Sequence, residues 1–180
     1  MIELREAAVS DAAGILAIYA PYVEKTAVSF EFDVPTVAEF AARIADISAE
    51  YPYLALFDGG VPAAYAYAHR AQARAAYGWN AELSIYIAQA YAGHGLGRLL
   101  YEALMELLRR QGVKTVYGVV TSPNPASEAL HRALGFHVAA RFHDAGWKDG
   151  AWHDVTWFER EIAPHDGAPQ PLRPVGEIGA

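Results

Sequence analysis

The 180-residue sequence contains no cysteine, which excludes disulfide bridges, thiolate metal ligands and a cysteine nucleophile. It contains no apolar run near the roughly 20 residues that a membrane-spanning helix requires, so we expect no membrane contact. Only 14 Lys and Arg face 21 Asp and Glu, and this net charge of −7 without a basic run argues against a nucleic-acid partner. Charge from Glu3 onward argues against a signal peptide, so we expect a cytoplasmic protein.

Apolar residues make up 53% of the sequence and charged residues 19%, as in an ordinary globular protein. The length suits one domain with a sizeable core, to which we assign residues 1–162. Residues 163–180 hold four prolines, three glycines and little apolar content, so we expect a disordered tail. The seven histidines show no metal-ligand spacing, and we expect no metal site.

Hydrophobic periodicity divides the domain into strands and helices. Ser10 is expected to cap the first helix, and Pro21 to kink or end it. Thr36 and Glu39 have the spacing of a capping box at the start of a second helix. The expected elements are strand 2–5, two helices before residue 52, an extended segment 26–35 between them, hairpin strands 53–57 and 61–69, loop 70–80, strand 84–88, a helix ending at Gly112, strand 114–120, helix 127–134 and strands 138–142 and 154–160. This order predicts an α+β fold in three α/β/α layers, a mixed sheet with helices on both faces.

The stretch from Glu82 to Gln111 joins a strand, a glycine-rich turn and an amphipathic helix. Gly93, Gly95 and Gly97 let backbone N–H groups approach an anion at the helix N-terminus, where the dipole favours a pyrophosphate. Glycine turns also join strands to helices for steric reasons alone, and both interpretations are open at this point. The turn is no P-loop, because no Gly-Lys-Ser/Thr follows, and its GxGxG spacing differs from the Rossmann GxGxxG.

This strand–turn–helix unit, followed by the run from Asn124 to Phe136, resembles the GNAT N-acetyltransferases. Matches over about residues 2 to 162 resemble one branch of that superfamily, the phosphinothricin / methionine sulfoximine acetyltransferases. The segments that carry the resemblance to this branch are Val28-Ser29-Phe30, Tyr51-Pro52, Arg74 to Trp79, Glu82, Leu130 to Phe136, Ala145 to Lys148 and Trp152 to Val155. The resemblance implies a twisted mixed sheet with helices on both faces, acetyl-CoA as co-substrate, a small-molecule amine substrate and a homodimer.

In this family a bulge in the central strand directs backbone groups toward the pantetheine arm, and the glycine turn holds the pyrophosphate. Carried over to this sequence, the resemblance implies cofactor-binding residues in the strand, in the turn and at the start of a later helix. They are Ile85, Tyr86, Ile87, Gly93, His94, Gly95, Leu96, Gly97, Arg98, Asn124 and Ser127. Ala92 departs from the family pattern, which often has arginine or glutamine before the first glycine.

Acetyl transfer to an amine needs a free lone pair, an electrophilic thioester carbonyl and a proton for the leaving thiolate. By resemblance Glu82 is the general base, acting through water; alternatively it is a solvated carboxylate at a strand end. His131 stands where many members have a tyrosine that protonates the thiolate. Its imidazole could act as acid or base, or the residue could be structural.

The resemblance places the acceptor among Phe30, Gln72, Arg74, Tyr77 and Ser84. Arg74 could hold an α-carboxylate bidentately, although it also fits an exposed loop charge. Gln72 and Glu31 stand where phosphinothricin acetyltransferases have a lysine and an arginine, so the preferred acceptor can differ from phosphinothricin.

His153 and Asp154 are neighbours on a strand and point to opposite faces, so we interpret them as structural or dimer-interface residues rather than a dyad. Three alternatives stay open from the sequence. The protein could acetylate another amine, such as a polyamine, an aminoglycoside or a protein N-terminus. It could bind acyl-CoA without catalysis, or it could be an α/β domain with no CoA site.

Overall fold

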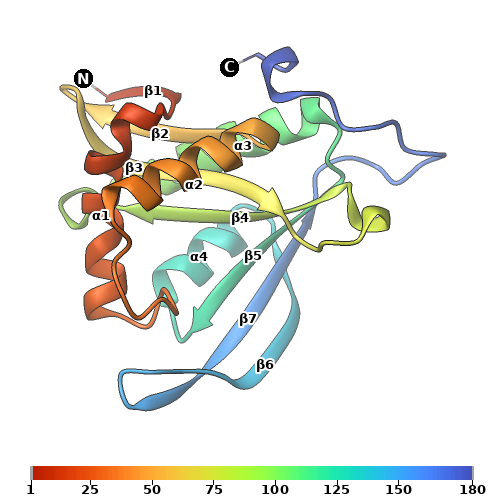
Figure 1. The fold of residues 1–180 in the computed structure, drawn as a ribbon. Coiled ribbons are helices and arrows are strands. Elements are labelled where there is room, and N and C mark those ends of the chain that lie inside the picture. The colour runs from red at the N-terminus through yellow and green to blue at the C-terminus, as the bar shows by residue number, and fades with distance from the viewer. Residues whose placement is uncertain (1, 180) are drawn as a thin grey trace.

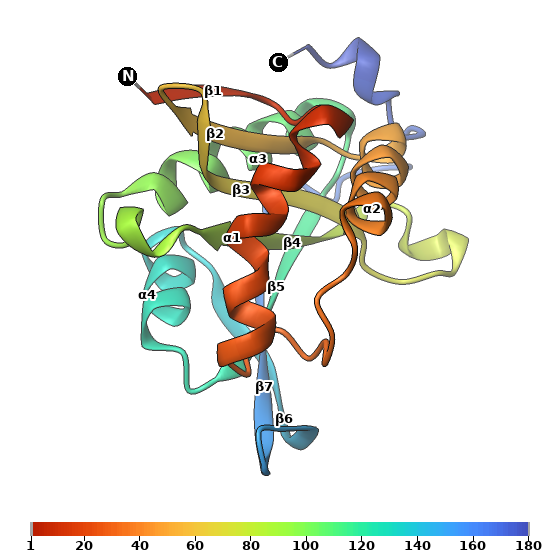
Figure 2. The same cartoon turned by 60° about the vertical axis from the view of Figure 1, so that its left-hand side comes forward.

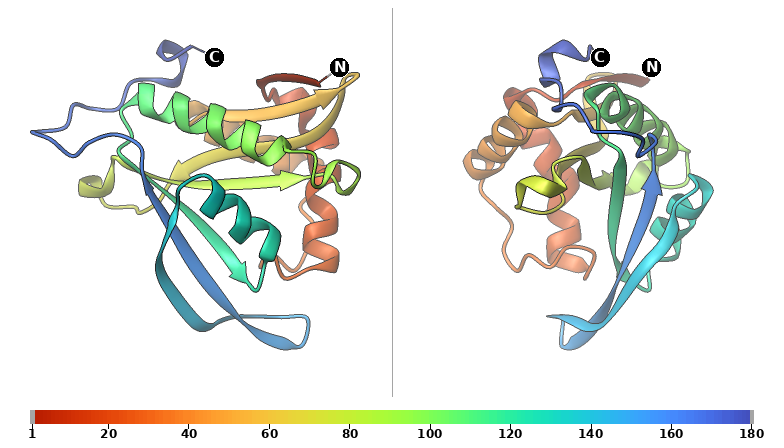
Figure 3. Two further views of the ribbon diagram at one scale, coloured as in Figure 1. Left: turned by 180° about the vertical axis from the view of Figure 1, so that it is seen from behind. Right: turned by 90° about the vertical axis from the view of Figure 1, so that its right-hand side faces the viewer.

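A computed structural model describes residues 2–179 of the chain, so the outer ends of the two predicted spans, residues 1 and 180, lie outside it. The centre is a seven-stranded sheet in the order β1-β2-β3-β4-β5-β7-β6. Figures 1 and 2 show α1 and α2 on one face, and Figure 3 shows α3 and α4 on the other. The predicted α+β fold is confirmed. The strands are β1 Ile2–Glu6, β2 Tyr53–Asp58, β3 Val61–Arg70, β4 Asn80–Ile87, β5 Thr115–Ser122, β6 His137–Lys148 and β7 Ala151–Glu161, and the helices are α1 Ala12–Lys25, α2 Val37–Glu50, α3 Leu96–Gln111 and α4 Pro125–Ala133.

Local sequence signals set several of these boundaries. The Thr36 hydroxyl accepts a hydrogen bond from the Glu39 N–H at 3.2 Å, and the Glu39 carboxylate accepts one from the Thr36 N–H at 2.7 Å, so the predicted capping box is confirmed. Gly112, at φ 107°, ends α3 as expected. Gly59 and Gly60 both have positive φ in the turn between β2 and β3.

The expected cap of the first helix was wrong, and the helix does not end at Pro21. Ser10 does not cap it: α1 follows a short 3₁₀ turn, in which the Asp11 carboxylate accepts the Ala8 N–H at 2.8 Å and pairs with Arg5 at 2.7 Å. Pro21 does not end it, because α1 runs on to Lys25. Burial of the following turn at Val23 offsets the hydrogen bond that the proline removes.

The last two strands form a hairpin much longer than predicted, while the segment 26–35 contains no strand. The register between β6 and β7 shifts between Phe142 and Gly146, and Asp144 has a φ of 49°. Such an irregularity breaks the two-residue alternation from which strand length is read in a sequence. Figure 1 shows this hairpin extending away from the rest of the sheet.

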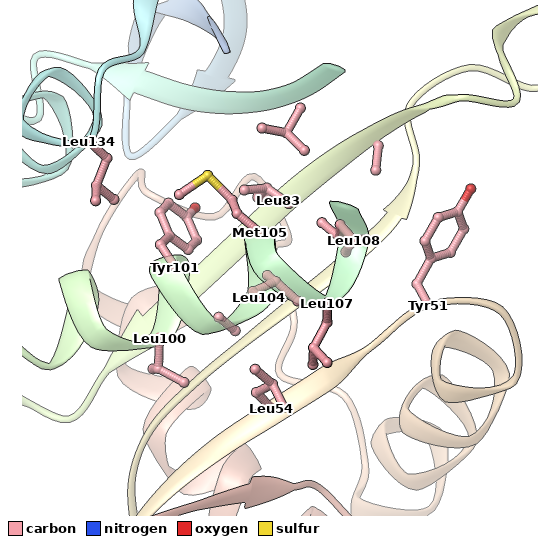
Figure 4. Packing of buried hydrophobic residues seen from close by; sticks show 14 of the residues in the cluster. Tyr51, Leu54, Leu83, Leu100, Tyr101, Leu104, Met105, Leu107, Leu108 and Leu134 are labelled. Atoms are coloured by element: carbon pink, nitrogen blue, oxygen red, sulfur yellow. The ribbon is translucent and has the colours of Figure 1, made fainter. Parts of the chain in front are cut away.

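Two apolar clusters cover the two faces of the sheet. One lies under α3, where Leu100, Leu104 and Leu108 are fully buried. Figure 4 shows these side chains against Leu54 of β2 and Leu83 of β4. The other cluster joins the sheet to α1 and α2 and is rich in tyrosine. No helix within residues 2–179 is both long and apolar enough to cross a membrane.

The tail was expected to be disordered, but in the structure its described residues make specific contacts with the domain. Ile178 is 6% exposed and belongs to the cluster under α3, against which Leu172 also packs. The Arg173 N–H donates to the Gln111 carbonyl at 2.8 Å, and the Trp79 indole N–H donates to the Gln170 carbonyl at 2.7 Å. Two apolar side chains and these hydrogen bonds pack a segment whose average composition is polar against the end of α3 and the loop before β4.

Candidate active site

The two central strands separate part of the way along the sheet. β4 and β5 pair in parallel from Asn80 opposite Thr115 to Leu83 opposite Gly118, and then diverge (Figure 1). Beyond Leu83, β4 pairs only with β3, and β5 pairs only with β7. A cavity opens in this split. Its lining comes from both strands, α3, α4 and the loop after α1: Val28, Leu83, Ser84, Ile85, Tyr86, Tyr101, Val119, Val120, Thr121, Asn124, Ser127 and His131.

The expected bulge in the central strand is absent from the β3–β4 pairing, whose register is unbroken from Ala64 opposite Ile87 to Arg70 opposite Ala81. The split exposes the backbone instead. The Ala88 N–H donates to the Ala63 carbonyl just beyond the last pair. Because bonded and non-bonded pairs alternate in an antiparallel ladder, the backbone groups of Ile85 and Ile87 face away from β3, toward the split, whereas those of Tyr86 face β3.

One of these exposed groups already has a partner. The Tyr22 hydroxyl of α1 donates to the Ile87 carbonyl at 2.6 Å. Within residues 2–179 the Ile85 N–H and C=O and the Ile87 N–H have no backbone partner, so they are available to a ligand that enters the split.

The glycine turn presents backbone N–H groups at the N-terminus of α3. Gly93 and Gly95 have φ values of 79° and 78°, which L side chains rarely adopt, and their open sides face no atom within 4 Å. The first N–H in the helical ladder is that of Leu99, which donates to the Gly95 carbonyl, so the N–H groups of residues 96–98 have no acceptor within the helix. These groups and the helix dipole are the features with which helix N-termini bind anions.

Three of the residues expected to bind the pyrophosphate have other contacts in the structure. The His94 N–H donates back to the Tyr91 carbonyl at 3.4 Å. The Arg98 guanidinium pairs with Glu102 at 2.8 Å on the exposed side of the helix. Packing favours glycine at position 97, since a Cβ there would lie 3.1 Å from the Leu130 side chain and 3.2 Å from the Ile87 side chain.

Glu82 lies directly across the sheet from His69 of β3. Its carboxylate oxygen Oε1 is 3.6 Å from His69 Nε2, and the two side chains are 22% and 38% exposed. Burial lowers the pKa of His69, but the hydrogen bond and negative charge of Glu82 outweigh it and leave the pKa raised. Tyr67 and Ser84 are paired one step further along the same two strands. The sheet thus gathers a carboxylate, an imidazole and two hydroxyl groups beside the start of the split.

His131 is 1% exposed and lies in the wall of the cavity. Its Nδ1 is 2.7 Å from the Ser127 carbonyl, which can only accept, so Nδ1 carries the proton. Nε2 is shielded from solvent and has no partner within residues 2–179, because it faces Gly118, where any Cβ would overlap the imidazole. Burial lowers the pKa of His131, so the ring is neutral and Nε2 is an acceptor.

Asn124 and Ser127 stand at the start of α4 and line the same cavity. The Asn124 side-chain carbonyl caps the helix by accepting the Ser127 N–H at 3.2 Å, which leaves its amide N–H groups to donate elsewhere. The Ser127 hydroxyl is 3.5 Å from His131 Nδ1.

The sequence did not single out Tyr101. This α3 residue is 1% exposed and lines the cavity. Its ring lies edge-on to that of His131, with 5.5 Å between the ring centroids. Burial raises the pKa of its phenol, so the hydroxyl stays protonated as a donor. In the described part of the chain this hydroxyl has no hydrogen-bond partner. The only sequence signal is its position four residues after Gly97, which places it over the glycine turn, and an apolar helix face hides such a tyrosine among core residues.

The expected acceptor residues fall into separate groups. Gln72, Arg74 and Tyr77 lie on the loop before β4, where Arg74 is exposed and has no ion-pair partner among residues 2–179. Phe30 lies elsewhere: it covers Gly146, and its ring centroid is 6.3 Å from that of His153 in the β6–β7 hairpin. Figure 1 shows the loop and this hairpin on different sides of the molecule. Only Ser84 lies within the split itself.

Two other expectations concern charged residues near the site. Glu31 pairs with Arg43 at 2.7 Å and accepts the Tyr19 hydroxyl at 2.9 Å, so its charge is balanced within the protein. His153 and Asp154 do not pair with one another. The His153 ring donates to the Lys148 carbonyl at 2.9 Å, and Asp154 pairs with a histidine of the neighbouring strand. Across residues 2–179, no three His, Asp or Glu side chains are grouped so that they could hold a metal ion.

Comparison with known proteins supports an acyl-transfer site. A family model described as an acetyltransferase (GNAT) domain matches residues 4–157. The phosphinothricin N-acetyltransferase of Streptomyces viridochromogenes is 36% identical over 98% of this chain and 96% of its own length. An L-methionine sulfoximine/L-methionine sulfone acetyltransferase of Pseudomonas paraeruginosa is 33% identical over 92% of this chain and 98% of its own.

A solved structure agrees with these sequence relatives. The phosphinothricin acetyltransferase from Sinorhizobium meliloti, in complex with acetyl-CoA, superposes with a TM-score of 0.92 at 31% identity, and the alignment covers 99% of both chains.

Proposed function

The chain belongs to the GNAT acetyltransferase family, and from this premise we propose that it transfers an acetyl group from acetyl-CoA directly to the amine of a small amino acid analogue of the phosphinothricin or methionine sulfoximine type. The observation that carries the proposal is the split between β4 and β5, which has the glycine turn beyond its open end and Glu82 beside its start. An extended cofactor arm placed in the split would join these two ends.

Acetyl-CoA would supply the activated acetyl thioester. The residues present fit it. The unpaired N–H groups of residues 96–98, together with the open space over Gly93 and Gly95, suit a pyrophosphate. The Ile85 backbone and the Asn124 amide, which face the split, suit the two amides of the pantetheine arm.

Glu82 is the proposed general base. A carboxylate held beside the split can take a proton from the acceptor ammonium, directly or through one water molecule, and so free the lone pair that attacks the carbonyl. His69 stabilises the anionic carboxylate from the neighbouring strand.

A proton donor is also needed near the thioester, and Tyr101 fits this role better than His131. The neutral His131 ring carries its only proton on Nδ1, which donates it to the Ser127 carbonyl, so the ring cannot donate into the cavity. The Tyr101 hydroxyl is protonated and has no hydrogen-bond partner among the described residues, and it can stabilise negative charge that develops on the carbonyl oxygen or on the sulfur. We therefore propose a positioning role for His131: it fills the space under Gly118 and supports the Tyr101 ring.

Arg74 is the proposed partner of the acceptor carboxylate, with Tyr77 beside it on the same loop. Gln72 is neutral, and the charge of Glu31 is already balanced by Arg43, so the acceptor side has fewer free cations than the resemblance to phosphinothricin acetyltransferases implied. A second anionic group is therefore poorly matched. This favours methionine sulfoximine, whose side chain is neutral, over phosphinothricin, which carries an anionic phosphinate. Acetylation neutralises the amine of such a toxic analogue, and we propose resistance as its outcome.

We also propose a homodimer acting in the cytoplasm, where acetyl-CoA is available. Large apolar side chains gather on the β6–β7 hairpin, where Val138, Phe142, Trp147 and Trp152 are 49%, 52%, 50% and 60% exposed. Apolar patches of this kind mark protein–protein interfaces. Light scattering coupled to size-exclusion chromatography measures the mass directly, and a monomer at micromolar concentration would contradict this part of the proposal.

A thiol-release assay tests the activity. Acetyl-CoA is supplied with methionine sulfoximine, phosphinothricin, the natural amino acids or polyamines, and free CoA is measured. We expect the highest kcat/KM with methionine sulfoximine. Turnover with polyamines and with no amino acid analogue would overturn the proposed substrate class, and acetyl-CoA that failed to raise Tm would argue against a CoA site.

A further inference from the structure

The C-terminal tail contacts the loop that carries Arg74 and Tyr77. The Trp79 indole N–H donates to the Gln170 carbonyl at 2.7 Å, across 91 positions of the chain. Trp79 is the last residue before β4, and its own carbonyl accepts the Lys114 N–H at 2.8 Å. The tail therefore meets the loop two residues after Tyr77 and three residues before Glu82. Figures 1 and 3 show the tail passing beside this loop.

The tail is itself fixed at both of its ends. At its start, His165 lies 3.1 Å from the Thr115 hydroxyl and 2.9 Å from the Glu161 carboxylate. Further along, Leu172 packs against the core cluster and Ile178 is buried. The Arg173 N–H donates to the Gln111 carbonyl at the end of α3.

Gln111, whose carbonyl accepts the Arg173 N–H, also contacts α2. The Gln111 side chain is 2% exposed and donates to the Glu50 carbonyl at the end of α2 at 2.7 Å. The Gln170 carbonyl is thus presented by a segment that is tied to rigid helices, rather than by a free end.

Between tail and loop the packing is open. Ala76, Trp79, Asn80, Lys114, His165 and Asp166 line a cavity of about 380 Å³ there. Close side-chain packing therefore does not hold the loop against the tail. The Trp79–Gln170 hydrogen bond is the specific contact that holds it there. Arg74 and Tyr77 are exposed, and their side chains have no hydrogen bond or ion pair within residues 2–179.

We propose that the tail is a positioning element for acceptor binding: through the Trp79–Gln170 hydrogen bond it holds the loop in the conformation that presents Arg74 and Tyr77 to the acceptor. This inference rests on the proposed acceptor role of the loop. It predicts that a looser tail weakens the amine site and leaves the acetyl-CoA site unchanged, because the glycine turn lies at the opposite end of β4.

The test uses the full-length chain with Trp79→Phe, which removes the indole N–H and keeps an aromatic ring. Hydrogen exchange of residues 70–79 and the rate of trypsin cleavage after Arg74 report on the loop without any turnover. We expect both to rise. We also expect KM for the amine to rise about threefold to tenfold, as loss of one hydrogen bond allows, with kcat and the acetyl-CoA Kd little changed.

Trp157→Phe is the matched control, because the Trp157 indole N–H has no hydrogen bond within residues 2–179 and its ring lies against Tyr117 and Phe142. Leu172→Ala is a second variant that loosens the tail anchor and leaves Trp79 intact. It should reproduce both the faster cleavage and the higher KM.

The outcomes separate the two proposals. Unchanged loop exchange in both Trp79→Phe and Leu172→Ala would overturn the tail's role whatever the activity. Faster loop exchange with an unchanged amine KM would also overturn it. If the wild-type enzyme turned over no amino acid analogue, the proposed function would fail, while the exchange measurements would still decide whether the tail holds the loop.

Discussion

His69 Nε2 lies 3.6 Å from Glu82 Oε1, at directly opposed positions on β3 and β4. The pair couples the proposed base to an imidazole whose positive charge depends on pH. It also explains why the pKa of His69 is raised although burial alone would lower it.

The first prediction concerns pH and stability in His69→Gln. A histidine with a raised folded-state pKa stabilises the protein fully below its unfolded pKa of about 6.5, and this contribution is lost as pH rises through the folded pKa. The wild-type Tm should therefore exceed that of His69→Gln most at pH 5.5, and the difference should shrink above pH 7. Thermal melts across pH 5.5–8.5 measure this. A constant difference across the range would rule out the ionic pair. The exposed His94, whose imidazole has no ion-pair partner within residues 2–179, provides a matched His→Gln control.

The second prediction concerns Glu82→Gln. The amide keeps the size of the side chain but cannot accept a proton, so kcat should fall about 10²- to 10⁴-fold. Acetyl-CoA binding by calorimetry should be unchanged, because the glycine turn is at the far end of β4. Glu106→Gln on α3, whose carboxylate pairs with Arg109 and Arg110 of the same helix, is the control. Retention of most of the activity would remove Glu82 from the mechanism.

The parts of this site that can be predicted from the sequence are those whose residues are close together along the chain. Glu82, the split strand and the glycine turn lie within one continuous stretch, and the capping box of Thr36 and Glu39 acts over three residues. Such features are readable because neighbours in the sequence are neighbours in space. The parts that sequence analysis missed become adjacent only through sheet register or helix docking. His69 meets Glu82 because β3 and β4 pair in one register, and Tyr101 enters the cavity because α3 packs under the split.

The tail and His131 also depend on contacts that sequence analysis could not predict. Composition predicted disorder after residue 162, since composition averages over residues, whereas Leu172 and Ile178 anchor the tail individually. The role of His131 was left open because its tautomer depends on the Ser127 carbonyl and its contact on Gly118, neither of which a sequence motif specifies.

The third prediction tests the hydroxyl of Tyr101. Tyr101→Phe keeps the ring against His131 and removes only the donor, so kcat should fall about 10- to 100-fold, as expected for one hydrogen bond to developing charge. Tm and the CoA Kd should change little. Tyr117→Phe, on β5 beside Trp157, is the control. If Tyr101→Phe were as active as the wild type, the proton donor would have to lie elsewhere.

The fourth prediction concerns Gly118→Ala. The added methyl group would overlap the His131 imidazole, which is stacked on Phe158 and cannot move away without repacking. Overpacking of this kind costs about 1–3 kcal/mol, so the free energy of unfolding should fall by that amount. Gly176→Ala, where the new methyl group meets no atom within 4 Å, should be nearly neutral. In the double variant with His131→Ala, the loss should be smaller than the sum of the two single losses, and simple additivity would show that the two sites are not coupled.

The fifth prediction concerns Lys148, which is 3% exposed and donates to the Val23 carbonyl at 2.7 Å and to the Ser29 carbonyl at 2.6 Å. It ties the β6–β7 hairpin to the end of α1 and to the loop that carries Phe30. Lys148→Met keeps the length of the side chain but leaves both carbonyls without this donor, at about 1–3 kcal/mol each, so Tm should fall by about 5 °C or more.

Because Phe30 lies on the loop that Lys148 holds, Lys148→Met should also raise the amine KM if Phe30 walls the acceptor pocket, and leave the acetyl-CoA Kd unchanged. The exposed Lys25→Met at the end of α1 serves as the control for loss of a surface charge. Thermal melts and steady-state kinetics on the same preparations separate the two effects. A lower Tm with an unchanged amine KM would keep Lys148 as a structural tie and remove Phe30 from the acceptor site.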